Sequence, residues 1–122
     1  MNLQELKYWA LDHGEINVLE WLETKEGNAP FTEEDAAEAV STGQLSVLKW
    51  LDARNVHANQ DGINLASLEG HLDVLKWFGE QGKYPNQEGV NYAVENNRLD
   101  TLRWLAEVDL YPDQEGVNTA AL

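Results

Sequence analysis

The 122-residue sequence contains no cysteine, which excludes a disulfide-stapled fold, a thiolate metal site and a cysteine nucleophile. None of its apolar runs approaches the ~20 residues of a membrane-spanning helix. The first fifteen residues, MNLQELKYWALDHGE, mix charged side chains with apolar ones and therefore lack the apolar core of a signal peptide. We expect a soluble, monomeric protein of the cytoplasm, that of a host cell if the protein is viral or a secreted effector.

Basic residues are scarce. Eight Lys and Arg face 22 Asp and Glu, which gives a formal net charge of -14. Such a field repels phosphate, so we expect no direct nucleic-acid binding, and the lack of a long apolar run predicts no membrane partner. The charge has two interpretations: it keeps an extended fold soluble, or it attracts another protein that has a basic surface.

Signatures of catalysis are also missing. The sequence has no His-Glu-x-x-His, no Gly-x-Ser-x-Gly and no phosphate-binding loop. Its three histidines, His13, His57 and His71, do not have the spacing of metal ligands. The many carboxylates could supply an acid–base pair, but they are better interpreted as solvated helix faces. We therefore expect no enzymatic activity, no cofactor and no metal.

What the sequence does contain is an internal repeat. Trp50, Trp77 and Trp104 lie 27 residues apart and end the hexapeptides LSVLKW, LDVLKW and LDTLRW, and a fourth copy, INVLEW, ends at Trp21. The stretches NQDGIN, NQEGVN and DQEGVN recur with the same spacing. The sequence predicts four units and a half unit, with approximate bounds 2–31, 32–58, 59–85, 86–112 and 113–122.

Each unit is predicted to form two helices. The first begins after a residue of N-cap type and ends at a residue that tolerates a left-handed backbone, Gly43, Gly70 or Asn97. A second helix of about ten residues follows, as in LDVLKWFGEQ, and Gly82 ends the third unit. The expected N-caps are Asn2, Thr32, Asn59, Asn86 and Asp113.

The second helix is apolar over more than half of its circumference, so it should pack on several sides. Trp77 lies at one edge of this apolar arc, beside the polar strip of Asp73 and Lys76. We therefore predict that the repeated tryptophans cover the seams between successive units. A binding surface for one target would vary from unit to unit, whereas repeated packing requires repeated residues.

The stretch ASLEGHLDVLKWFGEQG, residues 66–82, resembles the ankyrin repeat, with its small residues, Gly-His pair, aliphatic residues and closing Gly. The resemblance implies an all-α, right-handed ankyrin-like solenoid of helix-turn-helix repeats, about four and a half units in a single domain over residues 1–122. It also implies a structural hydrogen bond at His71. Similar divergent arrays occur in large viruses and some microbial eukaryotes.

The chain departs from the ankyrin pattern in two ways. Its units have 27 residues instead of about 33, a loss that falls where ankyrins project a β-hairpin finger. The family's Thr-Pro-Leu-His turn is replaced by DGIN and EGVN. A nearly all-helical variant without fingers is expected. The half unit at 113–122 is either a terminal cap or an array that stops mid-repeat. A cap should be polar outside, whereas Val117, Ala120 and Leu122 are as apolar as an interior unit requires.

Three alignment columns in the first helices vary while their neighbours repeat, and the resemblance places two of them on the concave, target-contacting face. Leu68 and Tyr92 are apolar or aromatic where other units have polar residues, although Leu65 and Tyr92 could instead pack within the stack. The predicted partner-binding residues are Trp9, Glu38, Leu65 and Tyr92 in the first column, Asp12, Ser41, Leu68 and Glu95 in the second, and His13, Thr42, Glu69 and Asn96 in the third.

Two functions follow. The first is a non-catalytic module that binds a target protein through the concave face of the first helices and the adjoining loops. The second is an acidic inhibitor, viral or microbial, that mimics the charge of nucleic acid and blocks a basic nucleic-acid-binding protein. An enzyme with a carboxylate pair is the least favoured of the three classes considered.

Overall fold

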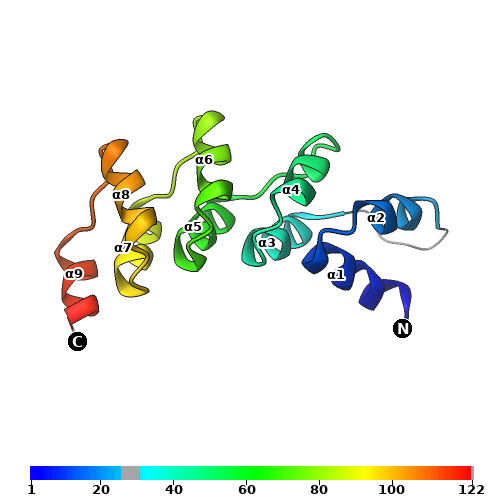
Figure 1. Ribbon diagram of the computed structural model, residues 1–122, viewed down its shortest axis with the longest axis horizontal. Helices are drawn as coiled ribbons and strands as arrows, with labels where there is room; N and C mark the ends of the chain where they lie inside the picture. The colour runs from blue at the N-terminus through cyan, green and yellow to red at the C-terminus, as the bar shows by residue number, and fades with distance from the viewer. Residues whose placement is uncertain (26–30, 122) are drawn as a thin grey trace. The chain divides into compact units, whose positions relative to one another are not determined.

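The computed structural model describes residues 1–25 and 31–121 (Figure 1). All regular secondary structure in these residues is α-helical, which confirms the all-α prediction for the described chain. None of these helices combines the length and the apolar character needed to cross a bilayer. The helices are α1 (Leu3–His13), α2 (Ile16–Glu23), α3 (Glu33–Ser41), α4 (Leu45–Asp52), α5 (Gln60–Glu69), α6 (Leu72–Glu80), α7 (Gln87–Glu95), α8 (Leu99–Glu107) and α9 (Gln114–Ala121).

Each predicted unit contributes a first helix (α1, α3, α5, α7, α9) and, for the four full units, a second helix (α2, α4, α6, α8). The chain also divides into two larger compact units, each of which contains more than one repeat. They are unit 1, residues 1–58, and unit 2, residues 59–122, and the division lies at a predicted repeat boundary. In unit 1, α1 packs on α2 and α3, and α3 packs on α4. In unit 2, α7 lies between α5 and α9, while α6 packs on α5 and α8 on α7 (Figure 1).

The first helices begin where the N-cap residues predict. Thr32 forms a capping box with Asp35 at the start of α3. At the other four starts, a side-chain oxygen accepts a hydrogen bond of 2.8 to 3.3 Å from the backbone N–H three residues later. Each cap thereby satisfies a backbone donor that has no partner within the helix. These four capping residues are Asn2, Asn59, Asn86 and Asp113.

The helix ends also follow the prediction. Gly43, Gly70 and Asn97 have φ values of 70°, 71° and 55°, the left-handed conformation that a Gly or Asn adopts at a helix terminus. Gly82 ends the third repeat with φ 74°. Asn55 and Asp109 lie at the equivalent positions of the second and fourth repeats and have the same backbone conformation, with φ 62° each.

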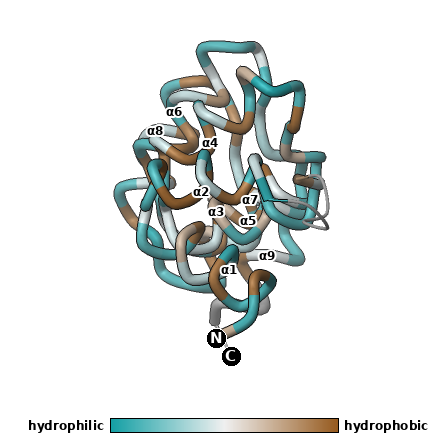
Figure 2. The backbone as a smooth tube through the Cα atoms, turned by 90° about the vertical axis from the view of Figure 1, so that its right-hand side faces the viewer, coloured by the Kyte–Doolittle hydropathy of each residue, from teal (hydrophilic) through white to brown (hydrophobic). Residues whose placement is uncertain are grey.

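The core of each unit is made by the inward faces of its helices. Hydrophilic and hydrophobic residues alternate along the chain within single helices (Figure 2), as expected for helices with one buried face. In unit 1, Leu11, Leu19 and Leu51 are fully buried. In unit 2, Val90, Ala93 and Leu105 form a buried cluster; burial of such side chains is the main favourable term in the folding of each unit.

Trp104 covers the seam between two successive repeats, as predicted. Its ring stacks on Tyr84, with centroids 6.1 Å apart and planes inclined by 26°. It also lies against Gly79 of α6, where an added Cβ would stand 3.0 Å from the indole ring. Trp104 therefore joins α8 to the helix and loop of the preceding repeat.

The other three repeated tryptophans differ in how far they are buried, and so in how well they fit the prediction that they cover seams. Trp50 is buried, with Phe31 edge-on to its ring at 5.1 Å and the Arg54 guanidinium over it at 3.6 Å. Trp77 is half-buried against Phe78. Trp21 departs from the prediction, because 47% of its surface is exposed.

Within unit 2, the repeated motif NQEGVN joins successive first helices through side-chain amides. Asn64 of α5 donates from Nδ2 to Asn86 Oδ1 at 2.8 Å, and its own Oδ1 accepts from the Asn86 backbone N–H at 3.1 Å. One repeat later, Asn91 makes the same pair of bonds with Asp113 at 2.9 and 3.1 Å. The last Asn of the first two copies, Asn64 and Asn91, therefore holds the cap of the next first helix.

The glycine of the motif makes room for this contact. A Cβ on Gly89 would stand 2.3 Å from Asn64 Oδ1, and one on Gly116 would stand 2.4 Å from Asn91 Oδ1. Because both glycines are the third residue after the cap, the close approach recurs with the repeat. The sequence revealed the motif but not this reason for it.

Unit 1 uses the same two positions with different chemistry. Counted from the N-cap, Lys7 holds the fifth position of α1, as Asn64 does in α5, and Asp35 holds the third position of α3, as Gly89 does in α7. Lys7 Nζ lies 3.1 Å from Asp35 Oδ2, and both side chains are almost fully buried. Asp35 also accepts from the Thr32 backbone N–H at 2.9 Å. Nothing in the sequence pattern marks Lys7 and Asp35 as a buried pair.

The amide contact predicts that Gly89→Ala is destabilising, although alanine normally stabilises the interior of a helix. We expect a loss of roughly 1–3 kcal/mol in the free energy of unfolding, because the new methyl group overpacks the seam. Urea unfolding followed by circular dichroism measures this loss. In the Asn64→Ala background the same substitution should cost less, because only the close approach to Pro85 Cβ, at 2.7 Å, remains. An equal cost in both backgrounds would place the clash at Pro85 and not at Asn64.

The buried ion pair predicts that Asp35→Ala destabilises unit 1 by about 3–5 kcal/mol, because Lys7 is left buried without its counter-charge. The same urea unfolding measures the loss. The double variant Lys7→Met, Asp35→Ala removes both charges and should recover part of it. If the double variant is less stable than the single one, charge burial is not the cause.

Candidate partner-binding faces of the first helices

The third variable column has a structural role at the end of the first helices. In three of its four members the side chain forms a hydrogen bond with the backbone oxygen four residues earlier, at 2.8 to 2.9 Å. The backbone oxygens of Glu38 and Tyr92 also accept from the backbone N–H of Thr42 and Asn96, so these side chains add a second hydrogen bond to a carbonyl of the last turn. Variation in this column is therefore explained in part by interchangeable groups that bond this carbonyl. The three side chains are His13, Thr42 and Asn96, and their acceptors are the backbone oxygens of Trp9, Glu38 and Tyr92.

In unit 1, the first column presents an accessible indole. Trp9 of α1 is 40% exposed and stacks on His13 of the same helix, with ring centroids 4.8 Å apart. Because His13 is itself held by the backbone oxygen of Trp9, the two rings form a preformed platform. Of the remaining predicted residues in this unit, Ser41 is half-buried.

Asp12 and Glu38 form a carboxyl pair near this platform. Asp12 Oδ1 is buried and accepts no hydrogen bond from the nitrogens or hydroxyls of the described residues, whereas a proton on Glu38 can supply one. This hydrogen bond is the main reason that the pKa of Glu38 is raised above its usual value, and burial and the charges of Asp12 and Asp35 raise it further. The pair therefore places two interacting carboxyl groups on the faces of α1 and α3.

In unit 2, Tyr92 lines an acidic pocket of about 330 Å³ between α7 and α9. Its hydroxyl donates to Glu88, which raises the pKa of Tyr92, and burial and nearby carboxylates raise it further. The other lining residues are Asn91, Glu95 and Glu115. The lining thus combines one aromatic ring with three carboxylates.

The remaining predicted residues of unit 2 lie on α5. Leu65, Leu68 and Glu69 are all half-buried. Leu65 and Tyr92 were each expected either to pack within the stack or to contact a partner. Tyr92 is half-buried as well, so both side chains are partly packed and partly accessible. Both side chains keep surface that a partner could contact.

Basic residues are distributed unequally between the first helices and the second helices of the repeats. The overall composition does not show this difference. The sequences of α3, α5, α7 and α9 contain no Lys or Arg, and the one basic residue of α1 is the buried Lys7. Each compact unit contains eleven acidic and four basic residues. The other basic residues lie on second helices or connections: Lys25, Lys49, Arg54, Lys76, Lys83, Arg98 and Arg103.

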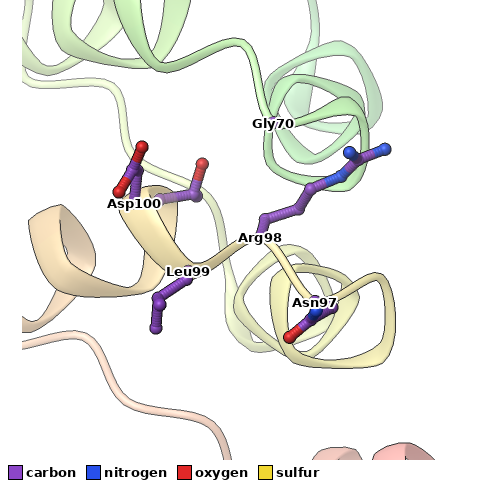
Figure 3. A pocket seen from close by; sticks show the side chains of 6 residues that line it. Gly70, Asn97, Arg98, Leu99 and Asp100 are labelled. Carbon is purple, nitrogen blue, oxygen red and sulfur yellow. The ribbon is translucent and has the colours of Figure 1, made fainter.

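A second pocket, of about 310 Å³, lies beside Arg98 at the start of α8 (Figure 3). The Arg98 side chain extends toward Gly70, and its Nε donates to the backbone oxygen of Leu68 at 2.9 Å. Gln44 makes the equivalent bond to the backbone oxygen of Asp12 at 2.7 Å in unit 1. Arg98 and Gln44 precede their second helices as His71 does, so this position joins successive repeats, and the bond implied at His71 itself stays a prediction.

Among the described residues, no group of three or more His, Asp or Glu side chains is placed to hold a metal ion. His57 Nδ1 lies 2.6 Å from Asp52 Oδ1, in an exposed pair between α4 and the following connection. The expectation of a protein without enzymatic activity stays a prediction.

The carboxyl pair predicts a titration above the usual range for Glu38, because protonation relieves its repulsion with Asp12 and adds a hydrogen bond. A group whose pKa is raised on folding stabilises the fold below its unfolded pKa, and this contribution is lost as pH rises through the folded pKa. Carbon-detected NMR of the Glu38 carboxyl should show the raised midpoint, and Asp12→Asn should lower it. An unchanged midpoint in Asp12→Asn would show that Asp12 does not cause the raised pKa of Glu38.

Comparison with protein-family models, with curated proteins and with solved structures finds no match to this chain. The ankyrin resemblance of residues 66–82 therefore stays a prediction. The features that bear on function are those of the chain itself: two accessible aromatic rings beside carboxylates on helices that present no free basic residue.

Proposed function

We propose that the chain is a non-catalytic protein-interaction module, an ankyrin-like solenoid that binds a target protein through the exposed faces of its first helices. The observation that carries this proposal is the placement of Trp9 and Tyr92. They share one alignment column, both keep accessible surface, and their ring and hydroxyl contacts are with residues of their own helices. Trp104, by contrast, is committed to a seam between repeats.

Accessible aromatic side chains suit this role because they bury a large area with little loss of rotamer freedom, and they often dominate the energy of an interface. Trp9 lies on the same helix as Asp12, and Tyr92 shares its pocket with Glu88, Glu95 and Glu115. A ring beside carboxylates favours a cationic group, which gains both charge attraction and contact with the ring face. The favoured target is therefore a protein that presents Arg or Lys side chains.

The charge segregation also supports the second function, an acidic inhibitor that imitates nucleic acid. A face with carboxylates and no free basic residue resembles a phosphate backbone in its electrostatic potential. Under this alternative, the target is a nucleic-acid-binding protein and the carboxylates supply most of the affinity. The two functions share a face and differ in which side chains provide the binding energy.

Binding measurements on single variants test the first function. After a target is identified by affinity capture and mass spectrometry, Trp9→Ala and Tyr92→Ala should each weaken its affinity roughly tenfold or more, as expected for aromatic anchors. Isothermal titration calorimetry gives the dissociation constants. Trp21→Ala is the matched control, because Trp21 is exposed to a similar extent but lies on a second helix. A target that responds only to the control would refute the proposed face.

The salt dependence of the same complex separates the two functions. Between about 0.1 M and 1 M salt, the Debye length falls from ~10 Å to ~3 Å. An acidic mimic should lose most of its affinity over this range, whereas an aromatic-anchored interface should lose little. Steep salt dependence combined with unaffected Trp9 and Tyr92 variants would favour the inhibitor.

A further inference from the structure

The packing of α1 on α3 in unit 1 brings two carboxyl groups together. Asp12 lies in the last turn of α1, and Glu38 lies on α3, one turn after Asp35. Both side chains are half-buried, and Asp12 Oδ1 is shielded from solvent. The pair therefore belongs to the contact between the two helices and not to the solvated surface.

Elsewhere in the same contact, a buried carboxylate has both a counter-charge and a donor. Asp35 lies 3.1 Å from Lys7 Nζ and also accepts from the Thr32 backbone N–H. Asp12 Oδ1 has neither partner, because no nitrogen or hydroxyl of the described residues donates to it. A proton on Glu38 can supply the missing hydrogen bond.

In the described part of unit 1, the surrounding charges do not neutralise this pair. The charges that act on Glu38 are both negative, those of Asp12 and Asp35. On α1, Lys7 is paired with Asp35, and His13 is bonded to a backbone oxygen of its own helix. The charged side chains of α2 and α4 are either exposed or in ion pairs with the following connections: Glu20, Glu23, Lys49 and Asp52.

We propose that Asp12 and Glu38 form a pH-sensitive latch between α1 and α3, which is closed when the two carboxyl groups share one proton and loosened when both are ionised. With the proton present, Glu38 donates to Asp12 Oδ1 and the pair carries one negative charge. Loss of the proton leaves a shielded carboxylate oxygen without a donor and places two like charges in the helix contact. Both changes disfavour the packing of α1 on α3.

The latch closes in acid and loosens toward neutral pH. The hydrogen bond with Asp12 is the main reason that the pKa of Glu38 is raised in the folded chain. A group with a raised pKa stabilises the fold below its unfolded pKa, and this contribution is lost as pH rises through the folded pKa. Because the Trp9–His13 platform lies at the same end of α1 as Asp12, the latch also determines how firmly this platform is held.

Hydrogen–deuterium exchange of the full chain measures how often the contact opens. Protection factors of the α1 amides, corrected for the intrinsic effect of pH on exchange, are compared at about pH 4.5 and about pH 7.5. In the unmodified chain they should fall at least about threefold between the two pH values, because local opening becomes easier when the shared proton is lost.

Two conservative variants should keep the latch closed at both pH values. Glu38→Gln and Asp12→Asn each replace one carboxyl group by an amide of the same shape, whose N–H donates to the remaining carboxylate without titrating. Glu38→Ala removes the donor and should show low protection at both pH values. Glu34→Gln is the matched control, since Glu34 is an exposed residue of the same helix, and it should respond to pH as the unmodified chain does.

An equal fall in protection in Glu38→Gln and in the unmodified chain, or no fall in the unmodified chain, would overturn the proposal. If circular dichroism shows that Glu38→Gln does not fold, Asp12→Asn decides the question in its place. The latch does not depend on the proposed partner-binding function, because exchange is measured on the chain alone. Unchanged target binding by Trp9→Ala and Tyr92→Ala would refute that function and leave the latch intact, so the two proposals fail separately.

Discussion

The contact between the fifth residue of one first helix and the capped first turn of the next determines much of the remaining structure. In unit 2 this contact is the amide pair of Asn64 with Asn86 and the pair of Asn91 with Asp113. In unit 1 it is the ion pair of Lys7 and Asp35. In both units, a buried polar group is satisfied only when successive first helices lie at one spacing and register, because a buried polar atom without a partner is costly. The polar seam therefore specifies how the helices stack, while the apolar side chains supply most of the driving force.

This constraint explains why some positions repeat and others vary. The third residue after the cap must be Gly wherever an Asn of the preceding helix approaches it, and the residue before the second helix reaches back to the preceding repeat in Gln44 and Arg98. Trp104 is fixed in the same way by Tyr84 and Gly79. Residues engaged in a seam cannot change without changing their neighbours. Side chains such as Trp9 and Tyr92, whose ring and hydroxyl contacts are with residues of their own helices, are free to differ.

Sequence alone predicts the local features well, because caps and left-handed ends depend on one or two residues. Asn59 and Asn97, for example, have the predicted roles at the start of α5 and the end of α7. It does not predict features that depend on how two helices approach each other. The chemical change from Asn64 with Gly89 to Lys7 with Asp35 preserves the contact but removes the sequence similarity. Likewise, His13, Thr42 and Asn96 have little in common except the ability to donate to a helix carbonyl, so their column appeared variable.

The same physical argument connects the interior of the stack with its surface. In unit 2, the apolar side of α6 is covered in part by the next repeat, through Trp104 on Gly79 and Tyr84. Burial of such side chains in a seam releases free energy and fixes their identity. The variable faces along the first helices lie where no seam is made, and their chemistry follows from the interior contacts that they lack.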